Sequence, residues 1–424
     1  MTRPQLAAVV TEYRRYSHAQ HILDRFLFGY GWGGRHHHPA MDLVALYTDQ
    51  VPEGDLSRER AKLAPAMTIY PTIAEALCRG GDKLAVDGVL LIGEHGSYPR
   101  NEKGQTLYPR YEFFQQIVEV FRASGRSVPV FNDKHLSWNW DWAKEMVDTS
   151  KELGFAFLAG SSLPVARRLP PVDLPLGAEV EEATCIAPGG PDGYDIHALE
   201  AIQAMVERRR GGETGVVAVQ ALRGDAVWKA MKAGSWDSGG WDPALFEACL
   251  CRSHTLGQAR EGFNDRLPDA DEVPRLVGNN PAIAYRCEYA DGLKTTMLLL
   301  EGLVGDFTFA ARLNLPPSPS NPLPPGEGRV RGAARGGRAG EGAPLSTAMY
   351  LPPREVCNFF SPLVHHCETM FLTGKAPYPI ERTLLTTGLT AAGVESLWRG
   401  GKRLETPHLA VRYQPTEEST FWRG

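Results

Sequence analysis

The sequence has no regularly spaced cysteines, no excess of basic charge and no long apolar run. Its seven cysteines form no C-x-x-C pair, which favours reduced thiols in a cytoplasmic protein over a disulfide framework. The net charge of −5 argues against a nucleic-acid partner. The longest apolar stretch, at residues 297–304, is interrupted by Glu301 and is too short to span a bilayer. The chain does not begin like a signal peptide, so we expect a cytoplasmic protein without membrane association.

Glycine is also missing from a turn where a nucleotide-binding sheet needs it. Residues 6–10 (LAAVV) are expected to form a first strand that leads into a helix. A dinucleotide site uses glycines at this turn because backbone N–H groups must approach the pyrophosphate. Residues 11–18 instead read TEYRRYSH, and no glycine occurs before Gly29. The sequence thus predicts that any nicotinamide site here is degenerate.

The pattern of apolar residues divides the chain into two parts. Up to about residue 165 strands and helices alternate, with strands at 41–47, 86–92, 128–131 and 155–158 and helices at 72–78, 111–123 and 140–153. That order predicts an α/β, Rossmann-like, doubly wound parallel sheet. The second part has expected strands at 282–288, 294–303 and 306–312 and helices at 196–210 and 384–398. We therefore expect a domain at 1–165, then an α+β domain at 166–424 with a mainly antiparallel sheet, which serves substrate binding and oligomerisation.

Residues 316–344 differ from the rest of the chain. They are dense in Pro, Gly and Arg and nearly empty of large apolar side chains. Such a composition does not supply the burial that ordering requires, so we expect a disordered and dispensable insertion. The segments on its two sides, 306–312 and 345–351, are expected to be neighbours.

Ionisable residues gather where the expected parallel strands end. Ligands of open α/β sheets bind at this carboxyl edge. We expect Lys134, His95 and His135 to act there as acids or bases. The candidates for holding a cofactor at the same edge are Thr11, Glu12, Asp49, Glu94 and Asp133. Two alternatives stay open: Glu94, His95, Asp133 and His135 could hold a divalent metal, or the edge could be a hydrogen-bonded polar rim.

A long loop follows His95 at this edge. Its Arg100, Lys103 and Arg110 are candidates for clamping an anionic or sugar substrate, and Trp138 could stack on a sugar ring. A solvated loop is the alternative. The triplet at residues 36–38, all histidine, is expected at the amino edge, away from this cleft, and is interpreted as structural.

Several segments together resemble the glucose–fructose oxidoreductase/inositol dehydrogenase/MocA family. They are residues 70–77 (YPTIAEAL) before 86–92 (VDGVLLI), Lys134 at a strand end, residues 193–197 (GYDIH), and the tail from 371 to 401. The resemblance implies NAD or NADP as the cofactor and a sugar or cyclitol as the substrate. It also implies that Lys134 and His197 act on the substrate. The family's aspartate, four residues before this histidine, is Gly193 here, and Asp195 is shifted by two positions.

These observations favour an oxidoreductase-like enzyme for a sugar or polyol, with a degenerate nicotinamide site. Lys134, His197, Asp195, His95 and His135 are its expected catalytic residues. One alternative is a cofactor-independent or metal-assisted lyase, isomerase or hydrolase acting on a carbohydrate. Another is a non-catalytic carbohydrate-binding protein. In each case we expect a small-molecule partner and a homo-oligomer.

Overall fold

The first part of the chain forms a six-stranded parallel sheet. The computed structural model describes residues 3–257, 266–314, 343–352 and 357–423. The strand order is β5-β4-β1-β6-β7-β8, and every neighbouring pair is parallel. The strands are β1 (Gln5–Val10), β4 (Asp42–Thr48), β5 (Thr68–Tyr70), β6 (Gly88–Ile92), β7 (Val130–Asp133) and β8 (Phe157–Gly160). This order confirms the Rossmann-like sheet that the sequence predicts.

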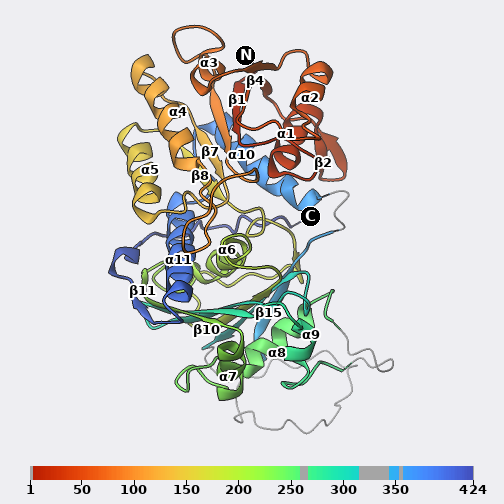
Figure 1. Cartoon of the computed structure of the whole chain (residues 1–424), viewed down its shortest axis with the longest axis vertical. Coiled ribbons are helices and arrows are strands. Elements are labelled where there is room, and N and C mark those ends of the chain that lie inside the picture. The colour runs from red at the N-terminus through yellow and green to blue at the C-terminus, as the bar shows by residue number, and fades with distance from the viewer. Residues whose placement is uncertain (1–2, 258–265, 315–342, 353–356, 424) are drawn as a thin grey trace.

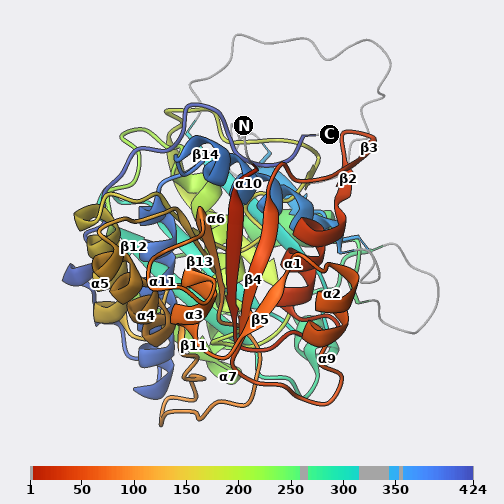
Figure 2. The same ribbon diagram turned by 90° about the horizontal axis from the view of Figure 1, so that it is seen from above.

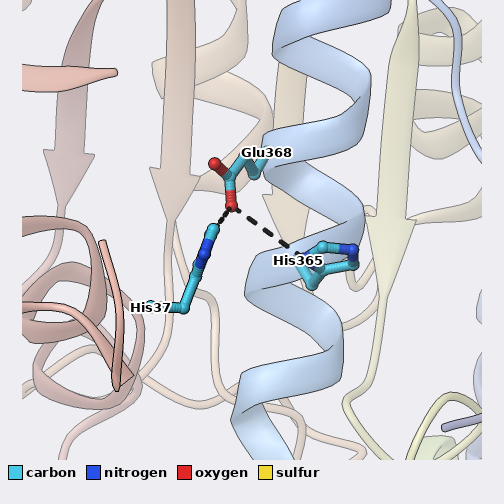
Figure 3. A group of neighbouring side chains, drawn as sticks. All are labelled: His37, His365 and Glu368. Atoms are coloured by element: carbon cyan, nitrogen blue, oxygen red, sulfur yellow. Dashed lines mark hydrogen bonds and ion pairs between the residues drawn. The ribbon is translucent and has the colours of Figure 1, made fainter. Parts of the chain in front are cut away.

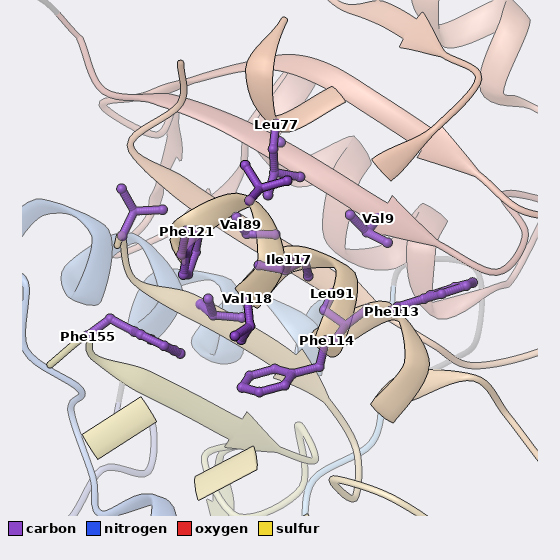
Figure 4. Packing of buried hydrophobic residues seen from close by; sticks show 14 of the residues in the cluster. Val9, Leu77, Val89, Leu91, Phe113, Phe114, Ile117, Val118, Phe121 and Phe155 are labelled. Carbon is purple, nitrogen blue, oxygen red and sulfur yellow. The ribbon is translucent and has the colours of Figure 1, made fainter. Parts of the chain in front are cut away.

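Both faces of this sheet are buried because alternate side chains of each strand point to opposite faces. Val9 joins a core with α3 (Ile73–Cys78), α4 (Arg110–Ser124) and α5 (Trp140–Glu152), whereas Val10 joins a core with α1 (His18–Phe28) and α10 (Ser361–Thr373). Figure 4 shows the first core, in which Val9 and Leu91 lie near Ile117 and Phe114 of α4. Figure 2 shows α1 and α2 (Ser57–Leu63) on one side of β4, and α3, α4 and α5 on the other.

Helix α10 reaches this core from far along the chain. It packs against α1 and against a short hairpin of β2 (Tyr30–Trp32) and β3 (Arg35–His37). The hairpin was not predicted. The proposed division at residue 165 therefore leaves α10 of the second part packed in a core of the first.

The second part forms an eight-stranded sheet of order β16-β11-β12-β13-β10-β14-β15-β9. All neighbouring pairs are antiparallel except β10 with β13, which confirms the mainly antiparallel sheet. Helices α6 (Asp195–Val206) and α11 (Ile380–Trp398) cover one face, and α7 (Asp225–Ala233), α8 (Pro243–Arg252) and α9 (Val273–Val277) cover the other. The strands are β9 (Arg168–Leu169), β10 (Val180–Ala187), β11 (Val216–Arg223), β12 (Ile283–Tyr289), β13 (Lys294–Leu299), β14 (Phe307–Leu313), β15 (Leu345–Met349) and β16 (Leu404–Glu405).

Helices α6 and α11 lie between the two sheets (Figure 1). Helix α11 contacts α5 and β8 of the first part as well as α6 and β11 of the second. Strands β14 and β15 pair directly, with Ala311 opposite Leu345, so the segments flanking the expected insertion are neighbours. Residues 316–342 of that insertion lie outside the described residues. Within the described chain, no helix combines the length and apolar character needed to cross a membrane.

Candidate functional site

The carboxyl edge of the parallel sheet is lined by buried ionisable groups. Glu94 and His95 follow β6, Lys134 and His135 follow β7, and Ser161 follows β8. Of these residues, Glu94, Lys134 and His135 are at most 7% exposed. Because the strands are parallel, their ends bring these side chains together, as the sequence predicts.

Lys134 is held by a buried ion-pair chain. Its Nζ donates to Glu94 Oε1 at 2.9 Å and to the Gly193 carbonyl at 3.2 Å. The other oxygen of Glu94 accepts from Arg110 Nη2 at 2.5 Å. Burial disfavours the charged form of Glu94, but the Lys134 and Arg110 cations outweigh it and hold its pKa well below the usual range.

Arg110 does not lie on an exposed loop where it could clamp a substrate. It is the first residue of α4 and is fully buried, with Nη1 3.1 Å from His135 Nε2. A Cβ on Gly93 would lie 2.5 Å from Arg110 Cγ, so this close packing requires glycine at the end of β6. Burial and the Arg110 charge lower the pKa of His135 well below its usual range, so this imidazole is neutral.

His18 brings a second group of imidazoles to the same edge. It is the first residue of α1, and its Nδ1 lies 2.6 Å from Asp133 Oδ2. Its ring centroid is 5.3 Å from that of His95 and 6.3 Å from that of His197. Burial, with the His18 charge, lowers the pKa of His95 to about 3. The sequence reasoning missed His18, although its place at a helix start beside the carboxyl edge could have indicated it.

His197 enters this edge from α6 in the second part. Its Nδ1 lies 2.5 Å from Ser161 Oγ, and the Ser161 N–H donates to the buried Glu200 carboxylate at 2.5 Å. Burial and the nearby Lys134 charge lower the pKa of His197 well below its usual range. Lys134 and His197, the two residues that the resemblance selects, are therefore electrostatic neighbours.

Asp195 supports the loop before α6. Its carboxylate accepts from the N–H groups of Asp192 and Ile196 and from Tyr285 at 3.0 Å. Burial raises the pKa of Asp195 to about 6 and that of Asp192 to about 7. Burial also raises the pKa of Glu200 to about 7, so Glu200 and Asp192, which the sequence reasoning missed, are the carboxyl groups here with pKa values nearest neutral pH.

The backbone itself is unusual at this edge. Six non-glycine residues of the described chain have positive φ, and three of them are His95 (70°), Lys134 (60°) and Asp192 (64°). This conformation is uncommon for residues with a Cβ, and such strain gathers at functional sites. Asp133 Oδ1 and His95 Nδ1 are also buried without a hydrogen-bond partner in the part of the chain that the structure describes. Such polar atoms are suited to meet a bound ligand or water.

The remaining candidates lie around this centre. Thr11 Oγ1 donates to the Glu94 carbonyl at 2.7 Å, and the buried Glu12 carboxylate accepts from Arg14 at 2.5 Å. Asp49 accepts from Tyr47 at 2.9 Å and from Tyr98 at 2.6 Å. Of the four expected metal candidates, Glu94 is engaged by two cations, Asp133 by His18 and His135 by Arg110, while His95 faces His18.

The other three predicted substrate-binding residues lie outside the buried centre. Arg100 and Lys103 are on the long loop after β6, and Trp138 precedes α5. Lys103 and Trp138 line one cleft of about 450 Å³, together with residues of α11. Lys103 pairs there with Glu395, and its Nζ lies 5.6 Å from the centroid of the Trp398 ring. Arg100 is exposed and forms a backbone bridge with Thr106.

Comparison with known proteins gives a match at the level of structure. A scan against protein-family models finds no match, and neither does a search of curated sequences. Among solved structures, myo-inositol 2-dehydrogenase from Lactobacillus plantarum superposes with a TM-score of 0.51 at 11% identity, covering 95% of this chain and 99% of that chain. GenD2 from gentamicin A biosynthesis, in complex with NAD, gives a TM-score of 0.52 at 14% identity, covering 96% and 97%.

A third structure is myo-inositol dehydrogenase from Lactobacillus casei, in complex with NAD(H) and myo-inositol. It gives a TM-score of 0.50 at 11% identity and covers 95% of this chain and 97% of that chain. At these identities the likeness concerns the fold. The chain therefore has the two-domain fold of the glucose–fructose oxidoreductase/inositol dehydrogenase/MocA proteins, as its sequence motifs suggest.

Proposed function

We propose that this chain is an oxidoreductase-like enzyme that acts on a sugar or polyol through an acid–base centre at Lys134, and that its nicotinamide site is degenerate. The observation that carries the proposal is the position of Lys134. Its ammonium group is fixed between Glu94 and the Gly193 carbonyl, on a strained backbone at the carboxyl edge. Two of the three structures named above are inositol dehydrogenases, which supports a hydroxylated ring as the ligand.

The groups around Lys134 would have different roles toward a bound substrate. His197 has Nδ1 engaged by Ser161, so Nε2 is the atom that would meet a substrate hydroxyl. Burial lowers its pKa, so the imidazole is neutral and can accept a hydrogen bond from a substrate hydroxyl. Lys134 would then stabilise the negative charge that develops on the substrate oxygen. Asp192 lies on the same loop as Gly193, and burial raises the pKa of its carboxyl group to about 7.

The residues between β1 and α1 do not fit a dinucleotide. A pyrophosphate needs bare backbone N–H groups at the helix start. Here Ser17 Oγ already accepts from the Gln20 N–H at 3.2 Å, and His18 is tied to the Asp133 carboxylate. Tyr13 is fully buried in the same turn, and the buried Glu12 carboxylate is paired with Arg14. NAD or NADP in the usual pose is therefore opposed by the side chains that occupy this turn, and we derive no hydride-transfer step.

The side chains that occupy the turn between β1 and α1 favour a second candidate function. Without a nicotinamide, the same centre can move protons beside a carbonyl, as in a lyase or isomerase for a carbohydrate. Lys134 and neutral His197 supply the required charge and base. A non-catalytic carbohydrate-binding protein remains an outcome of the test. The expected cytoplasmic location and homo-oligomeric state stay predictions.

The test is a panel of inositols, aldoses and ketoses, each with and without NAD or NADP. Calorimetry reports binding, and NMR of the mixtures reports any conversion. We expect at least one compound to be bound and converted by the parent and by His38→Ala, and conversion to be abolished in Lys134→Met. Binding without conversion would favour the carbohydrate-binding alternative. Equal conversion by Lys134→Met and the parent would contradict the proposal.

A further inference from the structure

A second cluster of ligand-type side chains lies away from the carboxyl edge. It consists of His37 from β3 and of His365 and Glu368 from α10. Figure 3 shows the Glu368 carboxylate between the two imidazoles. His37 Nε2 lies 2.7 Å and His365 Nδ1 4.0 Å from Glu368 Oε2. The three ligand atoms all lie within 4.8 Å of one another.

The spacing of these atoms is close to that of a zinc site. With Zn–N and Zn–O distances near 2.1 Å, ligand atoms in a tetrahedron are about 3.4 Å apart. The observed separations lie on both sides of that value. Small side-chain rotations would therefore bring the three atoms around one ion, without movement of β3 or α10.

Neighbouring groups already orient the ligands. The Ala40 N–H donates to Glu368 Oε1 at 2.7 Å, which leaves Oε2 directed at the imidazoles. The Tyr30 hydroxyl lies 3.3 Å from Glu368 Oε2 and 3.4 Å from His365 Nδ1. The Trp32 ring stacks on His365 with centroids 4.3 Å apart. Contacts of this kind fix ligand orientation and tune the affinity of metal sites.

The electrostatics also suit a cation. The Glu368 side chain is 5% exposed, so its carboxylate is largely removed from water, where a positive partner stabilises it. The His37 and His365 side chains are 30% and 35% exposed, so solvent reaches the cluster.

We propose that His37, His365 and Glu368 bind a divalent transition metal of the zinc class, with water in an open fourth position. Two imidazoles and a carboxylate are a donor set that zinc accepts in proteins. The ion would link the β2–β3 hairpin to α10, and thus join segments 331 residues apart in sequence. From the sequence, the histidines at 36–38 were interpreted as structural. The residues that accompany His37 in this cluster, His365 and Glu368, come from α10, far along the chain, so the sequence around the triplet does not reveal them.

The experiment uses the untagged full-length chain, freed of metal by chelator and dialysis. Zn²⁺ is titrated by calorimetry with elemental analysis of the product, and Co²⁺ is added separately to record its visible absorption. We expect one Zn²⁺ per chain, a higher unfolding temperature with Zn²⁺, and a tetrahedral-type Co²⁺ spectrum. His365→Ala and His37→Ala should each weaken Zn²⁺ binding by about 100-fold or more, since each removes a ligand.

The matched control is His38→Ala, which removes an exposed member of the same triplet that lies outside the cluster. It should bind Zn²⁺ as the parent does. His37 and His365 are partly exposed, so their variants are expected to fold, and circular dichroism of the metal-free proteins checks this. Failure of the parent to bind one equivalent of Zn²⁺, or equal affinity in His365→Ala and the parent, would overturn the proposal.

Discussion

Replacing Glu94 by Gln should destabilise the protein strongly. The substitution keeps the shape of the side chain but removes the anion that pairs with Lys134 at 2.9 Å and with Arg110 at 2.5 Å. These two cations are 7% and 0% exposed at the side chain, so water does not replace the lost partner. At an effective dielectric constant near 20, each contact represents roughly 6 kcal/mol of attraction, which desolvation largely offsets. Leaving the cations unpaired costs about 3–5 kcal/mol in unfolding free energy.

Urea unfolding followed by circular dichroism measures this loss. The control is Glu119→Gln, an exposed position in the middle of α4, where a change within about 0.5 kcal/mol is expected. Adding Lys134→Met to Glu94→Gln removes one of the unpaired cations and should recover part of the loss, as a double-mutant cycle would record. A Glu94→Gln protein as stable as Glu119→Gln would refute the buried ion-pair chain.

Two further predictions concern acid sensitivity and the insertion. In the folded protein His95 has a pKa of about 3, against 6.5 when it is unfolded, so the unfolded chain binds more protons below pH 6.5 and stability falls as the pH drops. Between pH 7 and pH 5 the unfolding free energy of the parent should therefore fall by about 2 kcal/mol more than that of His95→Gln. An identical pH dependence of the two proteins would contradict the lowered pKa. Deleting residues 317–343 should leave the thermal midpoint unchanged because their composition offers little burial, and a loss of several degrees would show that they support the β14–β15 pair.

Much of the first domain could be predicted from local sequence. Residues 86–92 are almost continuously apolar, as a strand buried on both faces requires, and they contain β6. Thr72 and Glu75 predict a helix start, and Thr72 Oγ1 indeed accepts from the Glu75 N–H at 3.1 Å. Boundaries were less accurate. Helix α6 ends at Val206 rather than residue 210, and α11 begins at Ile380, before the predicted 384.

The candidate site could be predicted only in part. Strand ends place Glu94, His95 and Lys134 at one edge, because parallel strands share their direction. The contributions of His18 and Arg110 depend on how α1 and α4 pack against that edge, which no local pattern encodes. Arg110 in particular was predicted to be a loop residue that clamps an anionic or sugar substrate, whereas Gly93 gives it room to be buried beside Glu94.

Titration of the purified protein with NAD and NADP by calorimetry tests the central claim most directly. The account predicts no binding tighter than about 100 µM for either, because the turn between β1 and α1 has no glycine, Ser17 already caps α1, and His18 is held by Asp133. Sub-micromolar affinity for NAD or NADP would contradict it, since the turn between β1 and α1 would then accept the phosphates despite these side chains.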